Sequence, residues 1–284
     1  MNSRPGAERV AQWALLAMLF ELSSSPKPGN VDRCHDFSDV GFHHFLTSAV
    51  SAYPVFRQAA EGGAAPGALI LKGVEAWQTW NLSSNTHFGS LVLMIPLAIA
   101  AGRPGELREE LKRVLDQSSN EDALAFYRAF SLAGARVVDV ESFSLKNQEW
   151  QNSLQESGRS LLDLMRLSAG HDLIACEWST YYRRSFLFSE KLKALIEEKG
   201  LNEGVVRAYL EALTEVPDSL VQAKFGIETA REVSRRAGQA LLDPTLEQAG
   251  LLDLSLLERD INPGSTADLI AASLFIALLR GLRF

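Results

Sequence analysis

Cysteine and long apolar runs are both scarce in this chain of 284 residues. Its two cysteines, Cys34 and Cys176, exclude a framework of several disulfides and a cysteine-rich structural zinc site. No uninterrupted apolar stretch reaches the length of about 18–20 residues that a membrane-spanning helix needs, and the nearest candidate, residues 91–101, contains Pro96. Residues 11–20 have the outline of a short signal peptide, but no small-residue cleavage site follows, which favours an amphipathic first helix. We therefore expect a cytoplasmic protein without a membrane partner.

Positive charge is in deficit, because 28 Lys and Arg stand against 35 Asp and Glu, a net charge of −7. A general nucleic-acid-binding surface needs an excess of basic side chains, so we expect no nucleic-acid partner. A small polyanion in one pocket is not excluded, since a few converging cations suffice to bind it. Hydrophobic residues make up 46% and charged residues 22% of the chain, as in globular proteins that bury a sizeable core.

Clusters of β-branched residues are nearly absent, and residues 137–140 are too few to anchor a sheet. Helical periodicity dominates instead, from Phe42 through residues 107–115, 123–133, 154–167, 186–196, 205–213 and 220–237. We predict an all-α fold in which a single domain, residues 1–284, forms a compact bundle of about ten to twelve helices. Residues 88–101 and 267–279 are apolar on nearly every side, which predicts two buried central helices.

Three polar segments interrupt this helical pattern, and the first, residues 23–39, is the richest in charge. It is long for a loop between bundle helices. Lys27 and Arg33 are suited to phosphate, whereas Asp32 and Asp36 are suited to Mg²⁺ or to proton transfer. The alternative is an ordinary solvated loop between two helices.

The other two segments precede the two buried helices. In residues 85–89, Asn85 or Thr86 could cap the helix, but free N–H groups could equally bind an anion there. Gly89 would let a ligand approach the backbone, and His87 could be an acid or base or a core histidine. In residues 262–268, Ser265 and Asp268 have the spacing of a capping box.

A carboxylate at the start of an apolar helix is costly unless it is paired or coordinated, so Asp268 is also a candidate site residue. Because both buried helices begin at polar turns that contain glycine, we expect the two turns to converge on one pocket. Asp218, which follows Pro217, is expected to cap a helix over residues 220–237, with Lys224 about one turn further along.

These segments, in this order, resemble the triphosphoribosyl-dephospho-CoA synthase family. The resemblance rests on Ser-Pro-Lys-Pro-Gly-Asn-Val-Asp-Arg at residues 25–33, Asn-Thr-His-x-Gly at 85–89 and Asn-Pro-Gly-Ser-Thr-Ala-Asp-Leu at 262–269. A weaker likeness covers residues 217–224, and the whole runs from about residue 10 to the C-terminus. The Asp-Phe pair at residues 36–37 is more similar to a branch found in archaea and one-carbon-metabolising bacteria.

The resemblance implies an all-α transferase that joins the triphosphoribosyl group of ATP to 3′-dephospho-CoA, or to a related ribosyl acceptor, and releases adenine. The product would be the precursor of a prosthetic group. The implied partners are small molecules, namely ATP with Mg²⁺ and the acceptor, and a homodimer is one assembly that we consider. Two alternatives are a Mg²⁺-dependent hydrolase of an ADP-ribose-like N-glycosidic bond and a non-catalytic helical nucleotide-binding protein.

For the implied reaction we expect the triphosphate and its Mg²⁺ to bind near Lys27 and Arg33, with Asp32 or Asp36 as metal ligands. Asp268 is our first choice for the general base, since an apolar helix should raise its pKa. His87 is our choice for the group near adenine, and Asp32 is a further catalytic candidate. The remaining nucleotide-binding candidates are Gly29, Asn30, Asn85, Thr86, Gly89, Lys224, Asn262 and Gly264.

Overall fold

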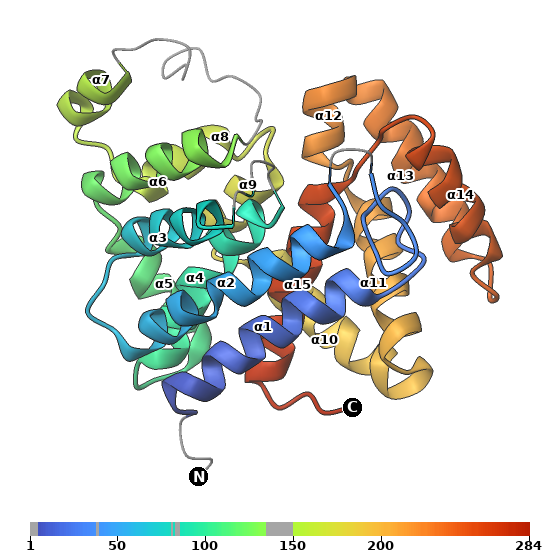
Figure 1. The fold of residues 1–284 in the computed structure, drawn as a ribbon, viewed down its shortest axis with the longest axis horizontal. Coiled ribbons are helices and arrows are strands. Elements are labelled where there is room, and N and C mark those ends of the chain that lie inside the picture. Colours follow the sequence, from blue (N-terminus) through green and yellow to red (C-terminus); the bar gives the residue numbers. More distant parts are fainter. Residues whose placement is uncertain (1–4, 38–39, 81, 83–85, 135–149) are drawn as a thin grey trace. The chain divides into compact units, whose positions relative to one another are not determined.

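The computed structural model describes residues 5–284 except 38–39, 81, 83–85 and 135–149. Its described residues form fifteen α-helices and no strand, which confirms the all-α fold (Figure 1). The cluster at residues 137–140 lies outside the described residues. The helices are α1 (Ala7–Ser23), α2 (Phe42–Glu61), α3 (Pro66–Gln78), α4 (Phe88–Gly102), α5 (Leu107–Asp116), α6 (Asn120–Ala133), α7 (Trp150–Ser157), α8 (Leu161–Ser168), α9 (Leu173–Ser179), α10 (Arg183–Lys199), α11 (Leu201–Glu215), α12 (Ser219–Phe225), α13 (Ile227–Leu241), α14 (Glu247–Leu257) and α15 (Gly264–Leu279).

The helices outnumber our estimate partly because two expected helices are each divided by a glycine. Gly158, with φ +62°, separates α7 from α8, and Gly226, with φ +84°, separates α12 from α13. A residue with positive φ cannot continue a right-handed helix, and glycine adopts that conformation without steric cost. The periodic pattern of apolar residues therefore continues across each glycine, whereas the helical backbone hydrogen bonds are interrupted there.

The chain separates into two compact units, each made of two segments. The first unit comprises Met1–Leu15 and Thr47–Arg183, and the second comprises Leu16–Leu46 and Arg184–Phe284. Each unit contains one of the two apolar helices that the sequence predicts, α4 in the first and α15 in the second. The single domain that we expect for residues 1–284 stays a prediction.

Helix α4 is the buried helix of the first unit and packs against α3, α5 and α9. It contains Pro96, which has no N–H to donate to the carbonyl oxygen of Val92 one turn earlier. The indole Nε1 of Trp178 donates to that oxygen at 3.2 Å, and the hydroxyl of Tyr182 donates to the next carbonyl oxygen, that of Leu93, at 3.0 Å. Side chains from α9 and the turn after it therefore replace a missing backbone donor inside the core.

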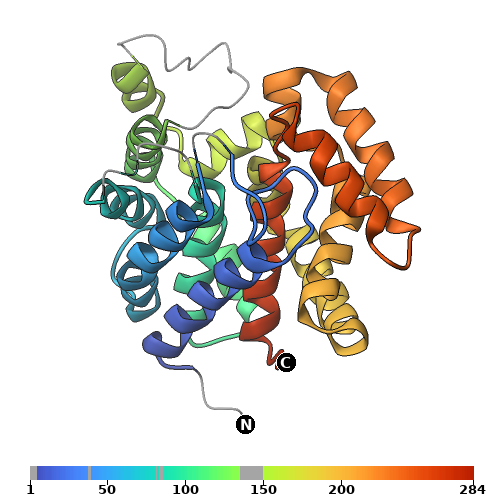
Figure 2. The same ribbon diagram turned by 45° about the vertical axis from the view of Figure 1, so that its right-hand side comes forward.

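Helix α15 is the buried helix of the second unit and lies beside α11 and α12 (Figures 1 and 2). Its residues from Leu269 to Leu278 are all buried. Helix α13 packs against α11, α12 and α14, so α11 and α12 each contact both α13 and α15. This arrangement holds the loop between α1 and α2, residues 24–41, against helices that come much later in the chain.

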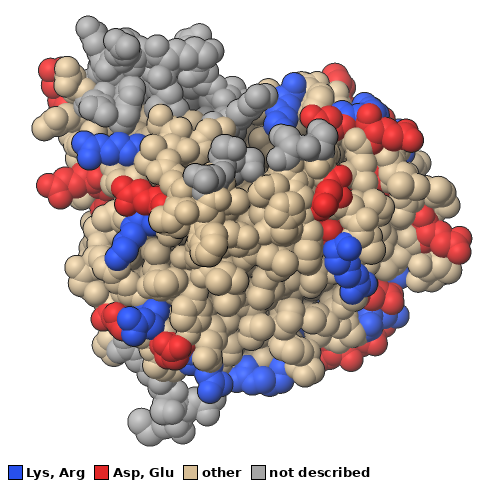
Figure 3. Space-filling view, viewed as in Figure 1, with Lys and Arg blue, Asp and Glu red and all other residues tan. Residues whose placement is uncertain are grey.

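Within the described residues, no single helix combines the length and hydropathy that crossing a membrane requires, although α4 and α5 reach them jointly with a bend of 117° between them. On the face shown in Figure 3, Lys and Arg are dispersed among Asp and Glu over the described residues. That face therefore offers no continuous basic surface, in agreement with the net charge of −7.

Candidate functional site

The loop of residues 24–41 is held to α11 by one side chain at the start of that helix and one in its middle. Asn202 accepts a hydrogen bond from the N–H of Ser25 at 3.0 Å and donates to the carbonyl oxygen of Ser25 at 2.8 Å. Further along α11, the hydroxyl of the buried Tyr209 donates to the carbonyl oxygen of Pro28 at 2.9 Å and accepts from Asn30 Nδ2 at 2.5 Å. The amide of Asn30, which we predicted to contact the nucleotide, thus fixes the loop.

Gly29 brings the loop against α14 and the segment that leads into α15. Its φ is +77°, and a Cβ at this position would overlap the carbonyl oxygen of Ile261 and lie 2.9 Å from Pro263 Cδ. Its N–H donates to Asp253 Oδ1 on α14 at 2.8 Å. The positive φ and the close approach both require glycine here, which explains the residue at the centre of the Pro-Lys-Pro-Gly segment.

Lys27 forms a buried ion pair with Glu21 of α1. Nζ lies 2.6 Å from Glu21 Oε1, and the side chains are only 1% and 7% exposed. Burial raises the pKa of Glu21, while the Lys27 ammonium acts in the opposite direction. The Lys27 ammonium, which we predicted to bind phosphate, therefore pairs with a carboxylate of its own unit. The sequence analysis did not predict this contact with Glu21.

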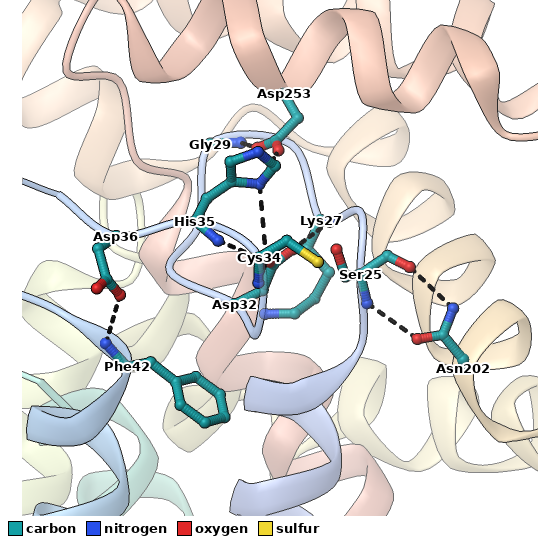
Figure 4. A network of polar contacts seen from close by, with 10 residues as sticks. All are labelled: Ser25, Lys27, Gly29, Asp32, Cys34, His35, Asp36, Phe42, Asn202 and Asp253. Atoms are coloured by element: carbon teal, nitrogen blue, oxygen red, sulfur yellow. Dashed lines mark hydrogen bonds and ion pairs between the residues drawn. The ribbon is translucent and has the colours of Figure 1, made fainter.

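Asp32, His35 and Asp253 bring three potential metal ligands together, with one atom of each lying within 4.8 Å of the others (Figure 4). His35 Nδ1 lies 2.9 Å from Asp253 Oδ2 and 3.7 Å from Asp32 Oδ1. Asp32 Oδ1 also accepts from the N–H groups of Cys34 and His35, at 2.7 and 3.2 Å. Burial raises the pKa of Asp253 to about 6, opposed by the hydrogen bond from Gly29.

Asp36 and Arg33 lie outside this group, on the exposed part of the loop. Asp36 Oδ1 accepts from the N–H of Phe42 at 2.6 Å, so this carboxylate caps the start of α2 (Figure 4). Arg33 makes no hydrogen bond or ion pair with the described part of the chain, and its guanidinium is open to solvent. The structure therefore pairs Asp32 with His35 and Asp253, not with Asp36.

The second polar segment belongs to the first unit. Asn85 lies outside the described residues. His87 occupies the N-cap position of α4 without capping it through its side chain, and its Nδ1 shares a hydrogen bond of 2.6 Å with Ser48 Oγ. Thr86 is half-buried, and Gly89 is the second residue of α4. The His87 side chain does not cap the helix start, and anion binding by the first N–H groups of α4 stays a prediction.

The third polar segment begins α15 in the second unit, and its cap comes from elsewhere. Asp218 caps α12 as predicted, accepting from the N–H groups of Leu220 and Val221. Its other oxygen accepts from the N–H and the hydroxyl of Thr266, both at 2.7 Å. The capping box suggested by the Ser265–Asp268 spacing is not formed, because α15 begins at Gly264 and Ser265 lies inside its first turn; the buried Asp218 carboxylate binds Thr266 there instead.

Other predicted site residues of the second unit surround that helix start. Asn262 Oδ1 is buried and accepts no hydrogen bond from the described residues, Gly264 is the first residue of α15, and Asp268 is half-buried. Lys224 is exposed in the last turn of α12. These residues and the loop of residues 24–41 lie in one unit, whereas His87 lies in the other, so their convergence stays a prediction.

Comparison with known proteins places the chain in one family. The family model described as ATP:dephospho-CoA triphosphoribosyl transferase matches residues 7–283. A protein of Streptococcus equi subsp. equi, named a probable 2-(5″-triphosphoribosyl)-3′-dephosphocoenzyme-A synthase, is 26% identical, with 95% of this chain and 96% of the relative covered. A protein of Streptococcus mutans with the same name is 24% identical over 99% of this chain and 100% of the relative.

A crystal structure from Archaeoglobus fulgidus, named as a candidate triphosphoribosyl-dephospho-CoA synthase, has a TM-score of 0.71 and 29% sequence identity. The match covers 85% of this chain and 100% of that chain. Motifs, family match and structural similarity agree along nearly the whole length. This chain is a transferase and belongs to the ATP:dephospho-CoA triphosphoribosyl transferase family.

Proposed function

We propose that this protein transfers the triphosphoribosyl group of ATP to 3′-dephospho-CoA or a related ribosyl acceptor and releases adenine. The observation that carries the proposal is the family match over residues 7–283. It is supported by the environment of residues 25–33, one of the segments that resemble the family, which is anchored by α11 and α14. A buried, anchored loop that still exposes Arg33 is suited to holding a substrate in one place.

The reaction replaces one bond at ribose C1′ of ATP. The N-glycosidic bond to adenine breaks, an acceptor hydroxyl oxygen forms the new bond to C1′, and adenine takes a proton as it leaves. The transition state resembles an oxocarbenium ion, so a nearby carboxylate stabilises it and a base accepts the hydroxyl proton. We assign the base to Asp268, which is half-buried near the start of α15, and we assign the contact with adenine to His87.

Substrate binding would use groups that the structure leaves open. Asn262 Oδ1, buried and without a described donor, could accept from a nucleotide N–H or O–H. Arg33 and Lys224 are exposed cations suited to the triphosphate. We keep Lys27, Gly29, Asn30, Thr86, Gly89 and Gly264 in the proposed nucleotide site, the first three chiefly through the shape that they give to the loop.

Mg²⁺ would accompany ATP and lower the charge of its phosphates. Asp36 suits that role, because it is exposed and uses Oδ1 to cap α2, so Oδ2 is available as a hard oxygen ligand. Asp32 is buried, and its Oδ1 accepts hydrogen bonds from two backbone N–H groups of the loop, so its carboxylate is less accessible to the Mg²⁺ of ATP than that of Asp36.

The test follows adenine release from ATP by chromatography and identifies the product by mass spectrometry, with and without dephospho-CoA. We expect adenine release only with the acceptor, and a product whose mass equals ATP plus dephospho-CoA minus adenine. Asp268→Asn should lower the rate about a hundredfold or more, as loss of a general base does. Asp260→Asn is the matched control at an exposed site and should leave the rate unchanged.

Adenine or ribosyl release without any acceptor would instead identify an N-glycosidic hydrolase. Full activity of a folded Asp268→Asn variant would refute the assignment of the base. A cytoplasmic location and a homodimer stay predictions, which cell fractionation and light scattering of the purified chain test.

A further inference from the structure

The cluster of Asp32, His35 and Asp253 is electrostatically incomplete. Asp253 is fully buried, and its Oδ1 accepts from Gly29. Its Oδ2 lies 2.9 Å from His35 Nδ1, yet within the described chain neither of these two atoms has a partner in hydrogen-bonding geometry. These two atoms thus face each other at contact distance inside the protein without a well-directed hydrogen bond, and a cation bound between them would satisfy both.

The neighbouring cation does not supply that charge. Lys27 is the buried cation nearest in sequence, and its ammonium already pairs with Glu21 at 2.6 Å. The carboxylates of Asp32 and Asp253 are both fully buried, so each carries a large desolvation cost. One imidazole, itself unaligned for hydrogen bonding with Asp253, is the remaining polar group of the cluster.

The spacing of the three side chains suits a bound metal ion. Two ligands whose bonds to one metal are about 2.1 Å long lie roughly 3.0–3.4 Å apart when adjacent and about 4.2 Å apart when opposite. The distances from His35 Nδ1 to Asp253 Oδ2 and Asp32 Oδ1, 2.9 and 3.7 Å, fall around these values. The His35 side chain is 32% exposed, so an ion can reach the cluster from solvent.

We propose that Asp32, His35 and Asp253 bind a divalent cation of the Mn²⁺ class, held by the protein itself in the absence of ATP. Two carboxylates and one imidazole favour first-row transition metals, whereas Mg²⁺ prefers oxygen ligands alone. The ion links the loop of residues 24–41 to α14. It therefore orders residues 25–33, one of the segments that resemble the family, before a nucleotide binds, separately from the Mg²⁺ that accompanies ATP.

The experiment measures metal binding directly, with neither ATP nor acceptor present, so it does not depend on the proposed transfer reaction. The full chain is freed of metal with a chelator and titrated with MnCl₂ while electron paramagnetic resonance reports free Mn²⁺. We expect one Mn²⁺ per chain, a rise in Tm, and weaker binding of Mg²⁺. His35→Gln and Asp253→Asn should each weaken the Mn²⁺ affinity about tenfold or more.

Two further measurements keep the test decisive. Co²⁺ bound to the chain should have a visible absorption spectrum that changes in His35→Gln, because a nitrogen ligand is lost. Cys34→Ser alters the exposed neighbour of His35 and should bind Mn²⁺ as the unaltered chain does. If Asp253→Asn fails to fold, the result for His35→Gln alone tests the proposal. The His35 side chain is partly exposed, so we expect this variant to fold.

The proposal is overturned if the chain binds no Mn²⁺, or if His35→Gln binds Mn²⁺ and gives the Co²⁺ spectrum of the unaltered chain. Tighter binding of Mg²⁺ than of Mn²⁺ would also overturn it, because that preference indicates a site made of oxygen ligands only.

Discussion

Replacing Lys27 by methionine should destabilise this protein severely, whatever part Lys27 plays in binding ATP. The change removes the only ammonium that contacts Glu21 within the described chain and leaves the buried Glu21 carboxylate without its partner. Burial already raises the pKa of this carboxyl even with Lys27 present. A charge left alone in such a place must either be protonated or draw water into the core.

The magnitude follows from the burial of both partners. Breaking a buried ion pair by removing one partner costs about 3–5 kcal/mol of unfolding free energy, whereas an exposed pair contributes less than about 1 kcal/mol. For a chain of this size each kcal/mol shifts Tm by about 2–4 °C. Lys27→Met should therefore lower Tm by roughly 6–20 °C.

The assay compares Lys27→Met, Glu21→Leu and the double variant by thermal unfolding and by adenine release. The double variant exchanges the ion pair for two apolar side chains, which is often neutral or stabilising in a buried site. It should recover most of the lost Tm. Adenine release by this stable double variant then reports on the ion pair without the stability defect, and full activity would exclude a phosphate-binding role for the Lys27 ammonium.

The reasoning is refuted if Lys27→Met unfolds within about 2 °C of the unaltered chain, since that small shift is typical of an exposed pair. It is equally refuted if the double variant is no more stable than Lys27→Met, because the lost stability would then come from packing and not from the unpaired carboxylate.

Three further predictions concern the loop and the helix starts. Gly29→Ala should cost clearly more unfolding free energy in urea than Gly62→Ala, which has a similar positive φ but open space and should lose only about 1–2 kcal/mol; equal losses would contradict the steric argument. Asp218→Ala should cost about 2–4 kcal/mol, because one buried carboxylate serves two helix starts; Glu258→Ala at an exposed position is its control, and a similar small loss in both would disprove the role. Asp36→Asn should keep the Tm, since Asn caps a helix as well as Asp does, but should raise KM for ATP with Mg²⁺; an unchanged KM would remove Asp36 from the metal-binding proposal.

Several features of the fold were predictable because they depend on neighbours along the chain. Helix α4 was expected over residues 88–101 and spans Phe88–Gly102, since an apolar segment with a polar, glycine-containing start marks its own limits. The N-cap role of Asp218 was read from the same kind of local signal. The division of residues 220–237 into two helices was missed, although Gly226 was visible, because glycine inside a helical pattern is often tolerated.

The candidate site was predictable only in part. The loop of residues 24–41 was recognisable by its length and its charge. Asp32, which we predicted as a metal ligand, lies in a cluster of potential metal ligands, and its role stays a prediction. Nothing in the sequence indicated Asp253, which lies on an ordinary helix 224 positions after Gly29, the residue that binds it. His35 belongs to the charged loop, but the sequence did not indicate that Asp253 lies beside it.

The sequence by itself determined the helices and the family, because helical hydrogen bonds join residues four apart and the family motifs are short continuous segments. Only the tertiary structure decided which charges are neutralised and which remain for chemistry. It paired Lys27 with Glu21, placed Asp253 beside His35, and gave α15 a cap from Asp218. Burial makes such pairings strong, and burial depends on helices that are distant in the chain and meet only in the folded protein.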